Sequence, residues 1–229
     1  CTLEMKKNRV LRAAFYAAGL VILALGIVLN TKSGLGVSPI ISGAYCVSEL
    51  SGLSFGDMTF ALYAVFVAVE MALHCIRRGE RPLAVVLGLD ALQLPLSLAF
   101  TRFMNLFSAW IPAPAGLAAR IAVLAAGIIL TGIGAAMSLD MRLIPNPGDG
   151  IVQALADCFK KPVGLTKNLF DLFCIGVTAA ISLIFARRLI GIGFGTVAAM
   201  LGVGRVIALF NRLFLDRMAT AAGIKNASA

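Results

Sequence analysis

Charged residues are scarce in this 229-residue chain: they make up 14% of it, whereas an average soluble domain carries about 25%. Aromatic residues are also few, at 8%, and there is one histidine. Hydrophobic residues reach 60% before the 23 glycines are counted, and the mean hydropathy is +0.95. Too little polar surface remains to enclose a water-soluble core, so the sequence predicts an integral membrane protein with no soluble catalytic domain.

Several motifs typical of catalytic and metal-binding sites are missing as well. The five cysteines show no CxxC spacing, and the chain has no Ser-His-Asp set, metal-ligand cluster, Walker loop or HExxH. We therefore expect no enzymatic activity, no metal and no cofactor. The net charge of +9 sits mostly in short stretches between apolar runs, which is typical of cytoplasmic loops and disfavours a nucleic-acid partner. The expected partners are the lipid bilayer and a small-molecule solute, and the sequence allows a homo-oligomer.

Six apolar runs are long enough to cross a bilayer, which takes about 20 residues each. They cover residues 13–31, 57–76, 83–107, 118–139, 165–186 and 189–211. Two more segments, 38–50 and 147–159, are too short, because about 13 helical residues span about 20 Å and the hydrocarbon core is about 30 Å thick. Each follows a glycine- or proline-rich stretch that can descend into the bilayer as an extended limb. This pattern predicts two re-entrant half-helices.

The basic residues test whether the short segments cross. With eight crossings and the N-terminus inside, the basic loop 77–81 lies outside; with six, it lies inside together with Arg142, Lys160 and Lys161. Since basic loops are enriched on the cytoplasmic side, six crossings are favoured. We expect a bacterial inner-membrane protein with both termini in the cytoplasm.

The chain resembles itself at an offset of 108 residues. The matches favour residues that punctuate helices, such as Gly19 with Gly127, Pro39 with Pro147 and Gly56 with Gly164. Chance recurrence of glycine in apolar helices is the alternative. The offset divides one integral membrane domain into repeats 1–107 and 116–214. Because each repeat has three spans, the second must lie inverted, giving an all-α polytopic fold with an inverted 3+3 repeat and a half-helix in each half.

Each predicted half-helix begins with an N-cap residue followed by proline: Ser38-Pro39 and Asn146-Pro147. In the inverted arrangement the two N-termini approach each other inside the membrane. Their backbone N–H groups and partial positive charge suit an anion or a polar carbonyl, and Gly36 and Gly148 let the backbone approach a solute closely. The simpler alternative is that these residues only start two helices.

Charged and polar residues within apolar runs are the remaining candidates for a solute site. Asp149 can cap its helix or bind a solute or cation. Lys167 and Asp171 lie four residues apart on one helical face and predict an intramembrane ion pair, functional or structural. Gln93 and Thr196 are uncharged candidates for lining a pore.

Three further polar residues, Glu70, His74 and Asp90, lie within or at the end of apolar runs. Glu70 and Asp90 also lie in apolar runs, where each can face a partner helix or a cavity. Glu70 and His74 fall near the cytoplasmic end of their run, which favours an interfacial position for both.

Several motifs, in this order, resemble those of the YczE/YyaS/YitT-type bacterial membrane proteins. They are Gly34-Leu-Gly-Val-Ser-Pro39, Gly52-Leu-Ser-Phe-Gly56, Leu92-Gln-Leu-Pro95, Asn146-Pro-Gly-Asp-Gly150, Lys167-Asn-Leu-Phe-Asp171 and Gly193-Phe-Gly-Thr196. The chain departs from that family at Asp149, where glutamate is usual, at Phe194, where an acid is common, and at Tyr63, where an amide is common. The resemblance implies a multi-pass membrane protein, and the family is presumed to transport something.

These features favour a transporter or channel for a small, polar, anionic solute bound near the midplane. The expected substrate-binding residues are Gly36, Ser38, Pro39, Gln93, Asn146, Pro147, Gly148, Asp149, Lys167, Asp171 and Thr196. The alternative is a non-transporting membrane subunit or regulator of another complex.

Overall fold

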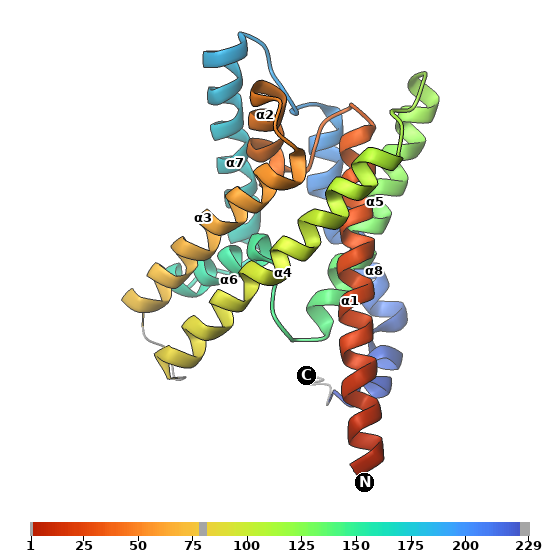
Figure 1. Ribbon diagram of the computed structural model, residues 1–229, viewed down its shortest axis with the longest axis vertical. Helices are drawn as coiled ribbons and strands as arrows, with labels where there is room; N and C mark the ends of the chain where they lie inside the picture. The colour runs from red at the N-terminus through yellow and green to blue at the C-terminus, as the bar shows by residue number, and fades with distance from the viewer. Residues whose placement is uncertain (1, 78–81, 225–229) are drawn as a thin grey trace.

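The computed structural model describes residues 2–77 and 82–224, and its regular structure within these ranges is helical throughout (Figure 1). The helices in chain order are α1 Thr2–Lys32, α2 Pro39–Ser51, α3 Phe55–Ile76, α4 Leu83–Trp110, α5 Leu117–Asp140, α6 Pro147–Phe159, α7 Val163–Ala186 and α8 Phe194–Ala221. Residues 78–81, most of the predicted basic loop, lie outside the described residues.

Six of the described helices are long and apolar enough to cross a membrane: α1 (from Asn8), α3, α4, α5, α7 and α8. Their outer surfaces are rich in large apolar side chains, for example Leu172, Phe173, Ile184 and Phe185 on α7. Such surfaces are stable against lipid rather than water. The protein is therefore an all-α, multi-pass membrane protein in contact with the bilayer, as the composition predicts.

The start of the last span differs from the prediction. Residue 189 was expected to begin it, but α8 begins at Phe194. Gly191 has a φ of 74°, and its carbonyl accepts a hydrogen bond from the Val37 N–H at 2.8 Å. This contact holds the segment before α8 in an irregular conformation that sequence periodicity cannot reveal.

The two short helices, α2 and α6, have 13 residues each and lie within one residue of their predicted bounds. Both have proline at the first helical position, whose fixed φ suits a helix start. Both are followed by a left-handed residue, Gly52 with φ 73° and Lys160 with φ 54°. A left-handed residue ends a helix by turning the chain away from its axis.

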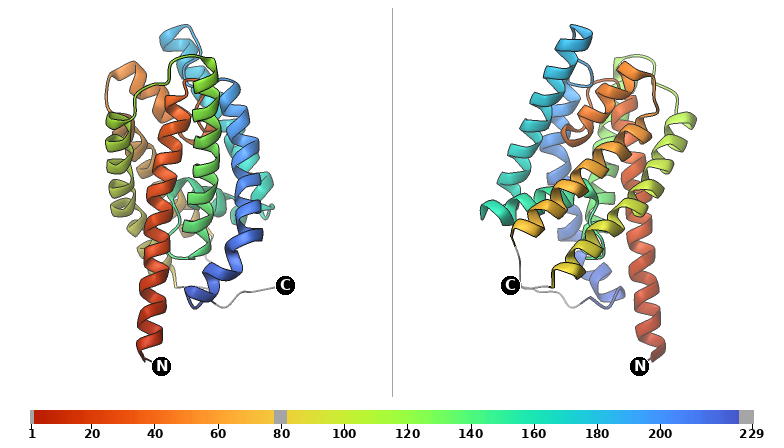
Figure 2. Two further views of the ribbon diagram at one scale, coloured as in Figure 1. Left: turned by 90° about the vertical axis from the view of Figure 1, so that its right-hand side faces the viewer. Right: turned by 60° about the vertical axis from the view of Figure 1, so that its left-hand side comes forward.

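The helices pack in two groups. In the first, α5 lies against α1 and α8, and α1 also contacts α4; in the second, α2 lies against α3 and α7, and α6 against α3 and α7. Figure 2 shows α1, α5 and α8 side by side as one layer. The principal connection between the groups is the contact of α3 with α4.

Helices α1 and α5 approach closely because glycines lie at their contact. A Cβ atom at Gly26 would overlap the backbone nitrogen of Thr131, and one at Gly134 would overlap the backbone nitrogen of Leu23. Small residues allow such approach in membranes, where dispersion contacts rather than the hydrophobic effect hold helices together. The α1–α5 pair is thus a tightly fitted centre of the first group.

Two arginines hydrogen-bond to the backbone at the ends of these two helices. Arg12 of α1 donates to the carbonyls of Met141 and Arg142 after α5, at 2.7 and 2.8 Å. Arg120 of α5 donates to the carbonyls of Ser33 and Gly34 after α1, at 2.7 and 2.5 Å. Each guanidinium satisfies carbonyls that the helix itself leaves unpaired. The four bonds fix α1 and α5 to each other at both ends.

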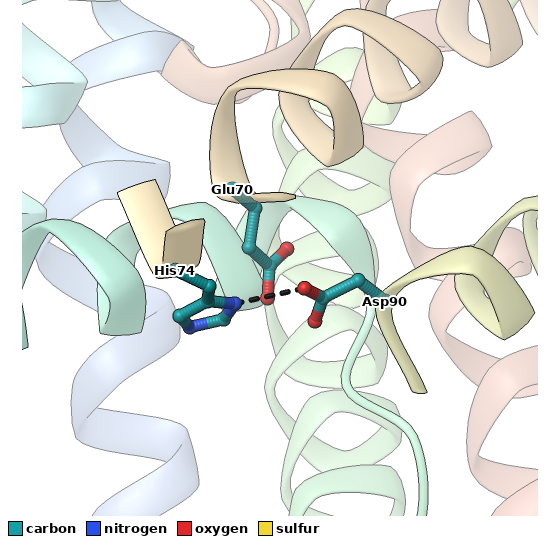
Figure 3. Close-up of side chains that lie close together, drawn as sticks. All are labelled: Glu70, His74 and Asp90. Carbon is teal, nitrogen blue, oxygen red and sulfur yellow. Dashed lines mark hydrogen bonds and ion pairs between the residues drawn. The ribbon is translucent and has the colours of Figure 1, made fainter. Parts of the chain in front are cut away.

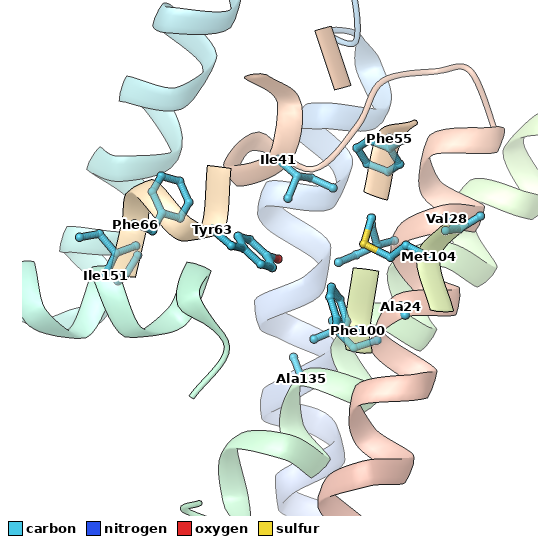
Figure 4. Close-up of a cluster of buried hydrophobic side chains, with 13 residues drawn as sticks. Ala24, Val28, Ile41, Phe55, Tyr63, Phe66, Phe100, Met104, Ala135 and Ile151 are labelled. Carbon is cyan, nitrogen blue, oxygen red and sulfur yellow. The ribbon is translucent and has the colours of Figure 1, made fainter. Parts of the chain in front are cut away.

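A buried apolar cluster lies between the two groups (Figure 4). Tyr63 of α3 stacks on Phe100 of α4 with ring centroids 6.2 Å apart, and Ile41 of α2 and Ile151 of α6 belong to the same cluster. The first turns of both short helices are therefore anchored in the interior of the protein.

Candidate functional site

The first turns of the two short helices meet in the interior. A Cβ atom added at Gly148, in the first turn of α6, would lie 3.2 Å from the Ile40 side chain, in the first turn of α2. Pro39, Pro147 and Gly148 are buried. The structure thus brings together the two Pro-led helix starts that the sequence singles out.

The two helix N-termini differ in how their N–H groups are satisfied. The Asn146 side-chain oxygen accepts from the Gly148 N–H at 3.1 Å. The Asn146 backbone carbonyl accepts from the N–H groups of Asp149 and Gly150 at 2.8 Å each. Ser38 makes no side-chain cap bond at the start of α2. The Ser38 carbonyl accepts from the Ile41 N–H at 3.2 Å, so the two starts differ by the side-chain bond of Asn146. Because α2 lacks that bond, its N-terminus is the better placed of the two to receive an anion.

Three charged residues gather beside the start of α6. Lys167 Nζ lies 3.4 Å from Asp171 Oδ2, which forms the predicted ion pair within α7. Both charges act electrostatically on the half-buried Asp149 carboxyl. The buried Tyr63 side chain reaches Asn146 and lies near Asp149. Asp171 is 1% exposed, and its Oδ1 has no hydrogen-bond partner among the described residues. One positive and two negative charges therefore lie together in the interior.

A second polar cluster joins α3 to α4 (Figure 3). His74 Nδ1 lies 2.8 Å from Asp90 Oδ2, and Gln93 Nε2 donates to Glu70 Oε2 at 3.0 Å. Glu70, Asp90 and Gln93 are 3%, 4% and 1% exposed. Glu70 therefore faces partner helices, one of the two surroundings expected for it, because Gln93 of α4 donates to it and Gly150 of α6 lies beside its carboxylate. Its interfacial position stays a prediction. Glu70 and His74 lie four residues apart and Asp90 and Gln93 three apart, so each pair shares one helical face. This spacing is the sequence signal that could have predicted the cluster.

A cavity of about 1190 Å³ opens beside this cluster. It lies between the end of α3, the start of α4, helix α6 and the segment after α5. The polar and charged side chains among its lining residues are His74, Arg77, Asp90, Asp157, Cys158, Lys160 and Lys161. A volume of this order is large enough for a small organic solute with its water.

A much smaller space, of about 10 Å³, lies next to the start of α6. Its lining includes Gln93, Ser97 and Asn146, and it shares Pro145 with the large cavity. Such a volume holds about one water molecule. Gln93 Oε1 and Ser97 Oγ have no hydrogen-bond partner among the described residues. Gln93 thus lies beside the start of α6, and its role in lining a pore stays a prediction.

The remaining two predicted residues, Gly36 and Thr196, lie elsewhere, between the segment after α1 and the start of α8. A Cβ atom at Gly36 would lie 2.6 Å from Thr196 Oγ1. Gly195 N–H donates to the Leu35 carbonyl at 2.7 Å, and Thr196 is 1% exposed. Both residues belong to a tightly packed contact and do not line either cavity.

Comparison with known proteins identifies the family. The model of a family of unknown function, DUF6198, matches residues 10–212. The chain belongs to this family. It is 25% identical over 206 residues to the uncharacterized membrane protein YczE of Bacillus subtilis (strain 168), covering 89% of this chain and 86% of YczE. It is also 25% identical over 199 residues to the uncharacterized protein YyaS of the same strain, covering 86% of this chain and 90% of YyaS. No solved structure matches the chain.

The matches extend over most of each relative, so the similarity applies to the whole membrane domain rather than to one motif. The resemblance inferred from the sequence motifs is confirmed. YczE is named a membrane protein, in agreement with the six candidate spans of this chain, and neither relative's name states an activity.

Proposed function

We propose that the protein is a bacterial inner-membrane transporter for a small, polar, anionic solute, built as an inverted repeat that alternates between two conformations. The observation that carries the proposal is a difference between repeat-related contacts. At one end of the protein the two helix groups are joined by hydrogen bonds and an ion pair. At the other end a Cβ atom at Gly164, the partner of Gly56, would meet none of the described residues, and the partners of Leu35 and Val37 line an open cavity.

Helix boundaries support the repeat. Helix α1 ends at Lys32 and α5 at Asp140; α2 covers Pro39–Ser51 and α6 covers Pro147–Phe159; α3 begins at Phe55 and α7 at Val163. All four boundaries are separated by the same 108 residues. The left-handed residues Gly52 and Lys160 also match at this offset.

Long-range contacts support the same relation. Arg12 and Arg120 are repeat-related, and so are their acceptors, Ser33 with Met141 and Gly34 with Arg142. A two-fold rotation that exchanges the repeats converts one set of bonds into the other. Chance recurrence of glycine does not explain reciprocal bonds between matched positions. Helix α3 also starts at the end of the protein where α1 finishes, as a re-entrant α2 requires (Figure 1).

One end of the protein is closed by contacts between the two helix groups. Gly56 N–H donates to Asn105 Oδ1 at 2.8 Å, Asn105 Nδ2 donates to Ser54 Oγ at 3.2 Å, and Arg102 pairs with Asp57 at 2.8 Å. These bonds join the start of α3 to the last turns of α4. The hydrogen bonds of Leu35 and Val37 to the segment around the start of α8 lie at the same end (Figure 1). We call this set of contacts the sealed end.

The matching elements at the other end are apart. Gly164 is the repeat partner of Gly56. Among the described residues, a Cβ atom at Gly164 would meet nothing within 4 Å, and the same holds for one at Gly204 on α8. Leu143 and Pro145, the repeat partners of Leu35 and Val37, line the large cavity rather than a packed contact. This difference is what an inverted-repeat carrier has in one of its two conformations.

The solute site we propose lies where the first turns of α2 and α6 meet. The N-terminus of α2 supplies a partial positive charge, and Lys167 supplies a full one. Asp171 pairs with Lys167 when no solute is bound, and Asp149 adds a second carboxyl beside the pair. Arg77, Lys160 and Lys161 line the cavity and favour the entry of anions. Gln93 lies between the cavity and the start of α6.

The alternative function is a non-transporting subunit or regulator. The exposed apolar faces of α7 and α8 suit a membrane partner as well as lipid. It predicts co-purification with a partner and no solute movement by the protein alone.

Uptake into proteoliposomes tests transport. We expect the purified protein to move at least one of chloride, nitrate, formate, sulfate and phosphate. Asp171→Asn and Lys167→Ala should each lower this uptake about tenfold, equivalent to about 1.4 kcal/mol of lost stabilisation. Glu49→Gln is the matched control, because Glu49 is an exposed acid of α2 outside the site. If none of these anions moves and both variants behave like the wild type, the alternative function is favoured.

A further inference from the structure

Glu70, His74 and Asp90 bring three potential metal ligands into one small volume. One ligand atom from each residue lies within 4.8 Å of the other two. The side chains point toward one another from α3 and α4 (Figure 3). Glu70 and Asp90 are almost fully buried, and His74 is the chain's one histidine.

The charge of this cluster is incompletely balanced. Among the described residues, Asp90 has the His74 imidazole as its ion-pair partner, and Glu70 has no ion-pair partner. Two carboxylates in the interior of a membrane protein are costly unless they are protonated, paired or bound to a cation. A divalent cation would neutralise both.

Gln93 provides an independent indication of a ligand. Its side chain is 1% exposed, its Nε2 is bonded to Glu70, and its Oε1 has no hydrogen-bond partner among the described residues. A Cβ atom at Gly150 would lie 2.7 Å from Glu70 Oε2 and 3.1 Å from Gln93 Oε1, so both oxygens lie close together beside the backbone of α6. A buried carbonyl oxygen without a donor is a ready ligand for a cation. Gln93 also orients the Glu70 carboxylate, as groups beside metal ligands commonly do.

A cation can reach the cluster because His74 and Asp90 line the large cavity. The basic residues Arg77, Lys160 and Lys161 line the same cavity, together with Asp157. The three basic side chains disfavour cations in the rest of the cavity. Cation binding is therefore confined to the point where the two carboxylates and the imidazole converge.

We propose that Glu70, His74 and Asp90, with Gln93 Oε1, form a binding site for one divalent transition-metal cation. Two carboxylates, an imidazole and an amide oxygen are the donors that Mn²⁺, Fe²⁺ and Zn²⁺ accept. Binding displaces the proton shared between His74 Nδ1 and Asp90 Oδ2, because both atoms become ligands. The site can be tested separately from the proposed transport activity, because Glu70, His74 and Asp90 lie outside the proposed solute site and Gln93 is the one residue that the two proposals share.

Mn²⁺ is the best probe, because Cys158 lines the cavity and a thiol would capture softer metals. We expect the full-length protein, purified in detergent without a polyhistidine tag, to bind one Mn²⁺, measured by electron paramagnetic resonance of free Mn²⁺. Glu70→Gln and Asp90→Asn should each weaken binding by at least about tenfold. Asp157→Asn, which alters a carboxylate of the same cavity outside the cluster, should leave the affinity unchanged.

Electron spin echo measurements on the Mn²⁺-loaded protein decide the question even where a variant fails to fold. Because the described chain has one histidine, a directly coordinated imidazole nitrogen has to come from His74. We expect that nitrogen coupling in the wild type and its loss in His74→Gln. Failure of the wild type to bind Mn²⁺, a bound ion without imidazole coupling, or equal affinity of wild type and Asp90→Asn would each overturn the site. None of these outcomes depends on solute movement, so they are distinguishable from a failure of the transport proposal.

Discussion

A disulfide across the sealed end is expected to stop solute movement. Ser54→Cys and Asn105→Cys together replace two side chains whose polar atoms lie 3.2 Å apart, one at the start of α3 and one near the end of α4. Cysteines at these two positions face each other across the contact, which makes them a candidate pair for oxidation. The alternating mechanism requires this end to open. Proteoliposomes with the oxidised protein should therefore take up no more solute than protein-free liposomes, and a reductant should restore transport.

The matched control uses the repeat partners of these positions. Pro162 is the partner of Ser54 at the offset of 108 residues. In the last helix of each half the offset is 103 residues, so Ala208 is the partner of Asn105. Both Pro162 and Ala208 are exposed in this conformation. The pair Pro162→Cys and Ala208→Cys should oxidise only as the protein visits the opposite conformation, and more slowly. Full uptake by the cross-linked Ser54/Asn105 variant would exclude movement between these helices as part of transport.

Gly134→Val is expected to destabilise the protein strongly. Any Cβ atom at this position overlaps the backbone of α1 at Leu23, and the four hydrogen bonds of Arg12 and Arg120 prevent α1 and α5 from separating freely. Overpacking of this kind costs about 1–3 kcal/mol, and more where the obstacle is backbone. In a chain of this length each kcal/mol lowers the melting temperature by about 2–4 °C.

Thermal unfolding of the detergent-solubilised protein measures this effect. Gly176→Val is the control, because Gly176 also lies in a spanning helix but has open space where the Cβ would be. The control should melt like the wild type. Equal melting temperatures of Gly134→Val and wild type would contradict the close packing of α1 and α5.

Much of the fold follows from local sequence signals. The six spans follow from the length of apolar runs, and the starts of α2 and α6 from Ser38-Pro39 and Asn146-Pro147, since an N-cap and proline act within one turn. The pair of Lys167 and Asp171 follows from a spacing of four residues. Each of these features depends on neighbours along one helix.

Features that depend on how separate helices pack were not predictable in the same way. His74 and Asp90 are joined across two helices, and nothing in either segment states that their faces meet. Arg12 and Arg120 look like ordinary interfacial residues until α1 and α5 are placed antiparallel. Thr196 was expected to line a pore, but Gly36 allows the backbone to pack against it, which buries its hydroxyl.

Labelling of single cysteines tests the central claim, the inverted six-span arrangement, most directly. Arg77→Cys at the end of α3 and Arg187→Cys after α7 would be introduced separately into a background without the native cysteines. Membrane-impermeant maleimide applied to right-side-out and inside-out vesicles then reports the side of each. The inverted arrangement predicts that the two positions are labelled from opposite sides, with Arg77→Cys reacting from the cytoplasm. Labelling of both from the same side, as eight crossings require, would contradict it.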